Sequence, residues 1–375
     1  MKILIVKLSA IGDVVQTLYA LDILRRALPE AQIDWLVEEA PSNLLLDHPM
    51  INKVIVVKKK GWLSSPRENL EVVKELRSTN YDMALDFQGL FKSGLWIYLS
   101  GAKKRIGFSN ARELSYIFLN EKLPPSDIER HAVERYLTLA RYAVKSTGAR
   151  VGLPTLSLNC PLYFGLKESS GVEALLQEGG ISGTEEFFII NPFARWSTKV
   201  WPLENAAEFI KMAKRELNMR AVVIGSKNEA KEAEELLRES GVEALNLAGK
   251  TTLKGLTALI SRARFVLTVD SGPMHMTAGL GVPQVAIFGP TSHIRTGPYG
   301  FEDSTIRREM SCAPCFKRVC PKPECMSEVT AKDAFDAVQQ CLLQNKDRGS
   351  KADRSISDEQ RDELTNAEER GPWLH

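Results

Sequence analysis

The first candidate for a catalytic group is a carboxylate close to the start of the chain. Asp13 follows the apolar run Ile3–Val6 and the tight loop Lys7–Gly12, just before a predicted helix over Val14–Ala27. At that position a carboxylate faces the carboxyl end of a strand and can act as a general base on a hydroxyl within hydrogen-bond reach. The alternative is an aspartate that only caps the helix. The loop has one glycine where a dinucleotide fingerprint needs three, so no nicotinamide cofactor is expected there.

A second group of polar residues separates two apolar runs within residues 265–291. The run Phe265–Asp270 ends in a carboxylate, a helix is predicted over Met274–Leu280, and the second run is Gln284–Gly289. This order is typical of a parallel β-α-β unit, whose helix start points N–H groups and a positive dipole end at a nearby anion. The alternative is a capping residue and a packed histidine. The residues that lie where a phosphate-bearing ligand would bind are Asp270, Ser271, Gly272 and His275.

Two further side chains follow apolar runs in the same half of the chain. Lys199 is flanked by Trp196 and Trp201. Aromatic neighbours on both sides indicate a partly enclosed lysine, which favours a phosphate contact over a solvated surface charge. Glu229 lies just past the predicted strand Ala221–Gly225. It either accepts hydrogen bonds from a ribose or simply lies in the first turn of the next helix.

Strands and helices alternate on both sides of a poorly periodic segment, which predicts an α/β protein with two Rossmann-like domains. Residues 151–183 are richer in Pro, Gly and Ser than the rest. The remaining predicted elements are strands Ile33–Val37, Lys53–Val57, Met83–Asp86, Lys104–Gly107 and Phe187–Asn191, and helices Arg67–Ser78, Leu203–Leu217 and Leu253–Arg262. We expect an N-terminal domain over residues 1–160, a linker region over 161–183, a C-terminal domain over 184–344 and a charged, disordered or loosely docked tail over 345–375.

The composition excludes several classes of protein. The chain has 375 residues, of which 44% are hydrophobic and 26% charged, as in a globular protein of two domains. A net charge of +2 argues against a strongly basic nucleic-acid binder. No apolar run suits a membrane span or a signal peptide, so we expect a cytoplasmic protein. Six cysteines in that compartment argue against a disulfide scaffold.

Two clusters leave alternatives open. The basic run Lys58–Lys60 is followed by Gly61-Trp62. Such a run is most often a solvated loop, but it also suits contact with phosphates on an acidic acceptor or with an anionic membrane surface. Cys312, Cys315, Cys320 and Cys325 have the spacing C-x2-C-x4-C-x4-C. A structural zinc and four free thiols are about equally favoured for these cysteines, and we expect no catalytic role for them.

Several motifs together resemble glycosyltransferase family nine, the lipopolysaccharide heptosyltransferases. In chain order they are KLSAIGDVVQTL, DFQGLFKS, HAVER, KVWP and VDSGPMHMTAGLGVPQVAIFGPT. The resemblance implies a two-domain GT-B fold in which the C-terminal half holds an ADP-heptose donor and the N-terminal half meets a Kdo-lipid A acceptor. It also implies peripheral contact with the cytoplasmic face of the inner membrane, and no nucleic-acid partner.

The resemblance also assigns roles to individual residues. It makes Asp13 the catalytic base, Lys199 a donor-phosphate lysine and Glu229 a nucleoside contact. The run Lys58–Lys60 departs from the arginine-rich version that the family has there. The positions that match the family's donor loop are Asp270, Ser271, Gly272 and His275, and those that match its acceptor-binding basic residues are Lys92 and Arg112.

The reaction expected from these assignments needs neither a metal nor a cofactor. The sequence has no Asp-x-Asp motif to hold a divalent ion on a diphosphate. Lys199 and the helix after Asp270 would meet the charge on the leaving ADP instead. We expect a single displacement with inversion at the anomeric carbon, in which Asp13 removes the acceptor's proton while domain closure excludes water.

Two other functions remain open at this point. One is a different cytosolic glycosyltransferase or a sugar-nucleotide epimerase that uses another nucleotide. The other is a catalytically silent nucleotide-sugar binding protein. A silent binder has no need of a carboxylate at Asp13, although a helix cap would look the same.

Overall fold

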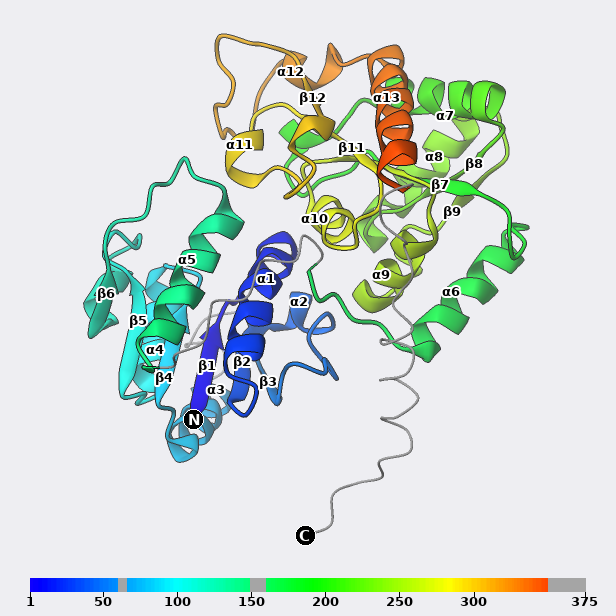
Figure 1. Ribbon diagram of the computed structural model, residues 1–375. Helices are drawn as coiled ribbons and strands as arrows, with labels where there is room; N and C mark the ends of the chain where they lie inside the picture. Colours follow the sequence, from blue (N-terminus) through cyan, green and yellow to red (C-terminus); the bar gives the residue numbers. More distant parts are fainter. Residues whose placement is uncertain (60–65, 149–159, 350–375) are drawn as a thin grey trace.

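The computed structural model describes residues 1–59, 66–148 and 160–349, which form two parallel six-stranded sheets flanked by helices (Figure 1). All strand pairs are parallel, as expected when helices connect successive strands. The predicted α/β class with two Rossmann-like domains is thereby confirmed.

The N-terminal sheet has the strand order β3-β2-β1-β4-β5-β6. Its central strand β1 is buried from Ile3 to Val6 and pairs with β2 and β4. The strands are β1 Lys2–Val6, β2 Gln32–Glu38, β3 Lys53–Val57, β4 Met83–Asp86, β5 Lys104–Phe108 and β6 Glu121–Leu123. The helices are α1 Ile11–Ala27, α2 Glu39–Ser42, α3 Pro66–Thr79, α4 Phe91–Leu99, α5 Ala132–Lys145 and the 3-10 helix η1 Ser115–Phe118.

The C-terminal sheet has the strand order β12-β11-β10-β7-β8-β9. Its strands are β7 Phe187–Asn191, β8 Arg220–Val223, β9 Ala244–Asn246, β10 Val266–Val269, β11 Gln284–Phe288 and β12 Thr305–Arg307. Its helices are α6 Leu166–Glu178, α7 Leu203–Leu217, α8 Ala230–Ser240, α9 Leu253–Arg262, α10 Gly272–Gly279, α11 His293–Thr296, α12 Glu324–Ser327 and α13 Ala331–Gly349, with the 3-10 helices η2 Ser197–Lys199, η3 Lys227–Glu229 and η4 Glu302–Ser304.

The two sheets have the same topology. Counted from the first strand of each domain, both orders are 3-2-1-4-5-6, so the order reverses between β1 and β4 in one sheet and between β7 and β10 in the other. At each reversal, the chain segments that follow the two neighbouring strands run in opposite directions along the sheet. This leaves a crevice at the carboxyl ends of the strands, where ligands bind in such folds. The fold therefore makes the loops after β1, β4, β7 and β10 the first places to look for a site.

Alternating side chains of β1 build the two faces of the N-terminal sheet. Ile3 and Ile5 face a core formed with α1 and α5, whereas Leu4 and Val6 face a second core formed with α3 and α4. The first core continues through buried residues of α9 and α10, so α1 connects the two domains. Figure 1 shows α1 between the N-terminal sheet and α10.

Some segments differ from the sequence-based expectations. The segment 161–183, predicted as a linker region, contains α6, whose Val172 and Leu176 are buried in the core shared with α9. Strands β6, β9 and β12 were not predicted, because each has only three residues and the periodicity of so short a run is not informative. The start of the predicted tail continues α13 as far as Gly349, and the rest of that tail lies outside the described residues.

Within the described ranges, no helix combines the length and the apolar character needed to cross a membrane.

Candidate active site

The start of α1 lies directly against the start of α10. A side chain added at Gly12 would overlap the ring of His275, and one added at Gly272 would lie 2.9 Å from Cγ2 of Ile11. Only glycine permits such a close approach at these positions. The first turns of the two helices, which carry Asp13 and His275, therefore meet across the boundary between the domains.

Asp13 is held by contacts to both of its carboxylate oxygens. Oδ2 accepts a hydrogen bond from the N–H of Ala10 at 2.9 Å, and Oδ1 lies 3.5 Å from Nζ of Lys7 and 3.4 Å from the hydroxyl of Tyr136. The side chain still keeps 42% of its surface exposed, which leaves room for an acceptor hydroxyl. Burial alone would raise the pKa of Asp13, but the charge of Lys7 and the hydrogen bond from the Ala10 N–H lower it. The carboxylate is thus kept ionised, as a general base requires.

Lys7 is a buried cation that the sequence-based assignment did not include. Its side chain is 2% exposed, and Nζ donates to the carbonyl oxygen of Phe87 at 3.0 Å and to the Tyr136 hydroxyl at 2.7 Å. Burial would lower the pKa of Lys7, but Asp13 and Tyr136 raise it, so the charge persists. A lysine directly after a buried strand, at the ligand edge of the sheet, was the sequence signal for this role.

On the other side of the boundary, Lys199 and Asp270 form an ion pair. Nζ of Lys199 lies 3.0 Å from Oδ2 of Asp270 and donates to the Asp270 carbonyl oxygen at 3.1 Å. It also lies 4.9 Å from the centre of the Trp196 ring, which confirms the partly enclosed setting predicted for Lys199. Asp270 accepts a second hydrogen bond, at 2.6 Å, from the hydroxyl of Thr291. Asp270 therefore orients Lys199 and does not cap α10.

The N-cap of α10 is Ser271, whose side chain makes no capping hydrogen bond to the helix. Its hydroxyl instead accepts from Nδ2 of Asn191 at 3.0 Å, at the end of β7. The start of α10 at Gly272 consequently has no side-chain cap hydrogen bond, which leaves the positive end of the helix dipole available to an anion. Together, the lysine and the helix start make a candidate site for a diphosphate.

His275 is neutral in this setting. Its side chain is buried, and burial lowers its pKa from 6.5 to about 4, although Asp270 and Asp13 oppose the shift. A neutral imidazole both donates and accepts a hydrogen bond. The ring sits against Gly12 and next to the base, where it can orient a bound group without adding charge.

The structure places Glu229 at the same edge of the C-terminal sheet, after β8. Its Oε2 accepts a hydrogen bond from the N–H of Ser226 at 2.6 Å, so Glu229 closes the turn that begins α8. The hydrogen bond to Ser226 uses Oε2 of Glu229. A nucleoside contact through the other carboxylate oxygen stays a prediction.

Lys92 and Arg112 follow β4 and β5 in the N-terminal sheet. Nζ of Lys92 donates to Oε1 of the buried Glu38 at 2.6 Å, which partly neutralises it. The backbone N–H of Arg112 donates to the carbonyl oxygen of Gly89, and this bond joins the two loops while the side chain remains exposed. Lys92 is in the first turn of α4, and Arg112 is in the loop after β5. Their acceptor role stays a prediction.

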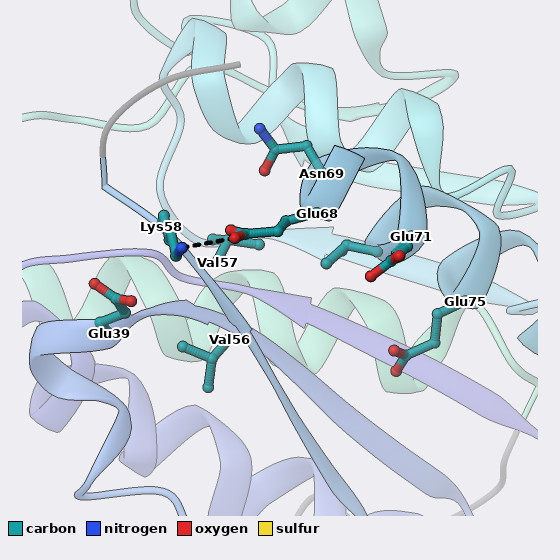
Figure 2. Close-up of a pocket in the computed structure, with 9 residues that line it drawn as sticks. Glu39, Val56, Val57, Lys58, Glu68, Asn69, Glu71 and Glu75 are labelled. Carbon is teal, nitrogen blue, oxygen red and sulfur yellow. Dashed lines mark hydrogen bonds and ion pairs between the residues drawn. The ribbon is translucent and has the colours of Figure 1, made fainter. Parts of the chain in front are cut away.

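A cavity of about 300 Å³ lies elsewhere in the N-terminal domain, between β3 and α3 (Figure 2). Four glutamates line it, at positions 39, 68, 71 and 75, and Nζ of Lys58 is paired with Glu68 at 2.7 Å. A wall of carboxylates repels phosphate, so this cavity does not suit the anionic ligand expected here. Lys58 is engaged in that ion pair, and Lys60, the end of the predicted basic run, lies outside the described residues.

The four clustered cysteines do not form a metal-binding group in this structure. Among the described residues, no three His, Cys, Asp or Glu side chains come together in a way that could hold a metal ion. The thiols of Cys312, Cys315, Cys320 and Cys325 are free. Of the two alternatives drawn from the sequence, this arrangement of the side chains favours the free thiols.

Two Rossmann-like domains whose switch-point loops meet across one boundary make up an architecture of the GT-B type, with the candidate base Asp13 on one side and the Lys199–Asp270 ion pair on the other. Comparison with known proteins specifies the family. The sequence pattern of Glycosyltransferase family 9 (heptosyltransferase) matches residues 69–326. The chain therefore belongs to glycosyltransferase family 9, the heptosyltransferases, and the predicted family is confirmed.

Individual relatives agree with this membership. Lipopolysaccharide heptosyltransferase 1 of Pseudomonas aeruginosa is 30% identical over 85% of this chain and 87% of its own length. The structure of E. coli heptosyltransferase WaaC with ADP-2-deoxy-2-fluoro heptose has a TM-score of 0.70 and 27% identity, and covers 91% of this chain and 99% of that one. E. coli ADP-heptose lps heptosyltransferase II has a TM-score of 0.71 and 25% identity, and covers 92% of this chain and all of that one.

Proposed function

We propose that the protein transfers L-glycero-D-manno-heptose from ADP-heptose to a Kdo-lipid A acceptor, as a heptosyltransferase of type I, with inversion at the anomeric carbon. The observation that carries the proposal is the contact between the first turns of α1 and α10, which brings the ionised Asp13 next to the anion-binding start of α10. One relative was solved with an ADP-heptose analogue, which supports the donor, and the name of another supports an acceptor of the lipopolysaccharide class.

In the proposed reaction Asp13 is the general base. It accepts the proton of the acceptor hydroxyl while that oxygen forms a bond to the anomeric carbon on the face opposite the ADP. The bond from the anomeric carbon to the ADP oxygen breaks, and its electron pair stays on the leaving diphosphate. Lys7 and Tyr136 hold one carboxylate oxygen of Asp13, and the Ala10 N–H holds the other. This fixed orientation is part of the rate enhancement, because a misplaced base loses reach to the hydroxyl.

Charge on the leaving diphosphate is met by Lys199 and by the N–H groups at the start of α10. Both interactions strengthen as negative charge grows in the transition state, so they favour bond breaking over mere binding. Asp270 and Thr291 hold Lys199 at the edge of the site until the phosphates arrive. Glu229 contacts the nucleoside part of the donor in this proposal.

The N-terminal domain supplies the acceptor side. Lys92, in the first turn of α4 after β4, and Arg112, in the loop after β5, bind anionic groups of the acceptor. The catalytic step uses no metal and no cofactor, because Lys199 and α10 already provide the positive charge that a divalent ion would supply. We further propose that the protein works in the cytoplasm, bound peripherally to the inner face of the inner membrane.

A donor screen tests the proposal. ADP-heptose, UDP-sugars and GDP-sugars are compared for binding and for transfer to Kdo-lipid A, with the product followed by mass spectrometry and its anomeric configuration by NMR. We expect an increase of one heptosyl unit with ADP-heptose alone and an inverted linkage. Transfer from a UDP- or GDP-sugar would indicate a different glycosyltransferase, and binding without any transfer would indicate a silent nucleotide-sugar binder.

A further inference from the structure

An exposed apolar surface lies beside the proposed acceptor residues. Its side chains come from α4 and η1, and we call it the α4/η1 face: Phe91, Tyr98, Leu114 and Ile117, which are 47%, 53%, 58% and 58% exposed. Phe91 and Tyr98 are seven positions apart and so share one side of α4. Exposed large apolar side chains that gather in one place mark a surface that contacts another apolar phase.

The α4/η1 face is held together by aromatic contacts. The ring of Phe118, in η1, lies 5.2 Å from the ring of Phe91 and 6.0 Å from that of Tyr98, measured between centroids. Phe118 is half-buried and therefore fixes the two exposed rings from below. The surface is consequently a rigid part of the fold, so contact with a partner needs little further ordering.

Cations surround this face. The guanidinium of Arg105 lies 5.7 Å from the Tyr98 ring centre, Nζ of Lys122 lies 5.7 Å from the Tyr116 ring centre, and Arg112 is exposed just before Leu114. One carboxylate, Glu113, belongs to the same turn, and its Oε2 accepts a hydrogen bond from the N–H of Phe91 at 3.2 Å. Apolar and aromatic side chains with an excess of cations around them match an anionic bilayer surface, where rings enter the headgroup level and cations meet lipid phosphates.

We infer that the α4/η1 face docks the N-terminal domain on an anionic lipid bilayer. The inference rests on the proposed function, because it explains how a lipid-anchored acceptor reaches the site. Phe91 directly precedes Lys92, and the Arg112 N–H bond to Gly89 ties the loop before η1 to the loop before α4. The docking face and the proposed acceptor residues thus share two loops, and a docked protein has its acceptor loops at the height of the headgroups.

Vesicle binding of the full chain tests the inference. Vesicles of phosphatidylglycerol and phosphatidylcholine are compared with vesicles of phosphatidylcholine alone, by flotation, for the parent and the double variant Leu114→Ser/Ile117→Ser. We expect the parent to prefer the anionic vesicles and to be released by salt. The double variant should bind about tenfold more weakly, because two apolar side chains no longer enter the interface. The matched control Leu166→Ser/Leu343→Ser removes side chains that are 78% and 63% exposed on the other domain, and it should bind within about twofold of the parent.

A charge variant and a soluble substrate complete the test. Lys122→Gln changes one exposed cation and should cost about fivefold in binding to anionic vesicles. Three results would overturn the inference. The two double variants could bind vesicles equally well, the parent could fail to bind vesicles, or the substitutions could change self-association and leave vesicle binding unchanged. Thermal unfolding checks that each variant is folded. Transfer to an acceptor without acyl chains should be unchanged in all of them. A different result separates the inference from the proposed function. If the vesicles bind as expected but neither the parent nor any variant transfers heptose to that acceptor, the proposed function is wrong, whereas the docking of the α4/η1 face is still supported.

Discussion

Nζ of Lys7 lies 3.5 Å from Oδ1 of Asp13, and the lysine is almost completely buried while the aspartate stays partly exposed. A buried cation beside a half-exposed carboxylate keeps that carboxylate ionised. It also fixes the direction of the carboxylate, because Tyr136 contacts both residues. In the proposed reaction, Lys7 and Tyr136 therefore hold the base in place.

Replacing Lys7 by methionine should move the acid limb of the pH–rate profile to higher pH. Lys7 lowers the pKa of Asp13, so its removal raises that pKa and leaves less of the base ionised in mildly acidic solution. Activity should fall more at about pH 5 than at about pH 8. The measurement is kcat/KM against pH, with Tyr136→Phe as a milder comparison. A uniform loss at every pH would mean that Lys7 only stabilises the fold.

Lys199→Ala should weaken donor binding and also slow turnover. The lysine meets a charge that is larger in the transition state than in the ground state, and a charge-assisted hydrogen bond is worth about 1.5–3 kcal/mol, or about ten- to a hundredfold. Calorimetry with ADP and steady-state kinetics give the two effects separately. Lys211→Ala, at a half-exposed lysine of α7, is the control. If ADP affinity and turnover of Lys199→Ala both stay within about twofold of the parent, Lys199 has no role in donor binding and is a surface charge beside a tryptophan.

The sequence predicts the repeating part of this fold well. Long or strongly apolar segments such as Leu203–Leu217 and Lys53–Val57 have the predicted bounds. The apolar residues within each of these segments are sufficient to indicate the helix or strand. Three-residue strands such as β9 are not predicted, since so few residues pair with a neighbour only after the sheet exists. Helix α6 was overlooked because only its second half shows apolar spacing in the sequence.

The candidate site could be predicted only in part. Asp13, Lys199 and Asp270 each follow an apolar run at a strand end, and the topology of parallel sheets places such residues at one edge. Lys7 and Tyr136 are 129 positions apart, and their contact depends on how α5 packs on α1. Thr291 holds Asp270 from the end of another strand. Contacts of this kind are decided by tertiary packing, and no local sequence pattern contains them.

His275 should titrate near pH 4 in the folded protein. Burial lowers its pKa from 6.5 to about 4, so an NMR titration of the imidazole should show no change through neutral pH. The unfolded chain takes up the proton first as the pH falls. The resulting contribution to stability is complete above about 6.5 and is lost as the pH falls toward 4. His275→Gln should flatten that part of the stability curve, and an imidazole midpoint close to 6.5 would disprove the buried neutral state.

EDTA should leave the transfer rate unchanged within about twofold, because Lys199 and the start of α10 supply the charge that a metal would otherwise provide. The assay follows ADP release from ADP-heptose before and after chelation, with magnesium added back as the control. A loss that magnesium restores promptly would contradict the metal-free mechanism. A slow loss that accompanies unfolding and zinc release would point to the cysteine cluster instead.

The most direct measurement of the central claim is single-turnover transfer by Asp13→Ala, together with calorimetric binding of ADP to the same variant. A general base acts in the chemical step, whereas in the proposed complex the donor is held by Lys199 and α10 of the other domain. Asp13→Asn keeps the size of the side chain and serves as the matched variant. The account predicts a loss of at least about a hundredfold in transfer for both variants, with ADP affinity within about twofold of the parent. Near-normal transfer by Asp13→Ala in a folded protein would contradict it, and Asp13 would then be no more than a helix cap.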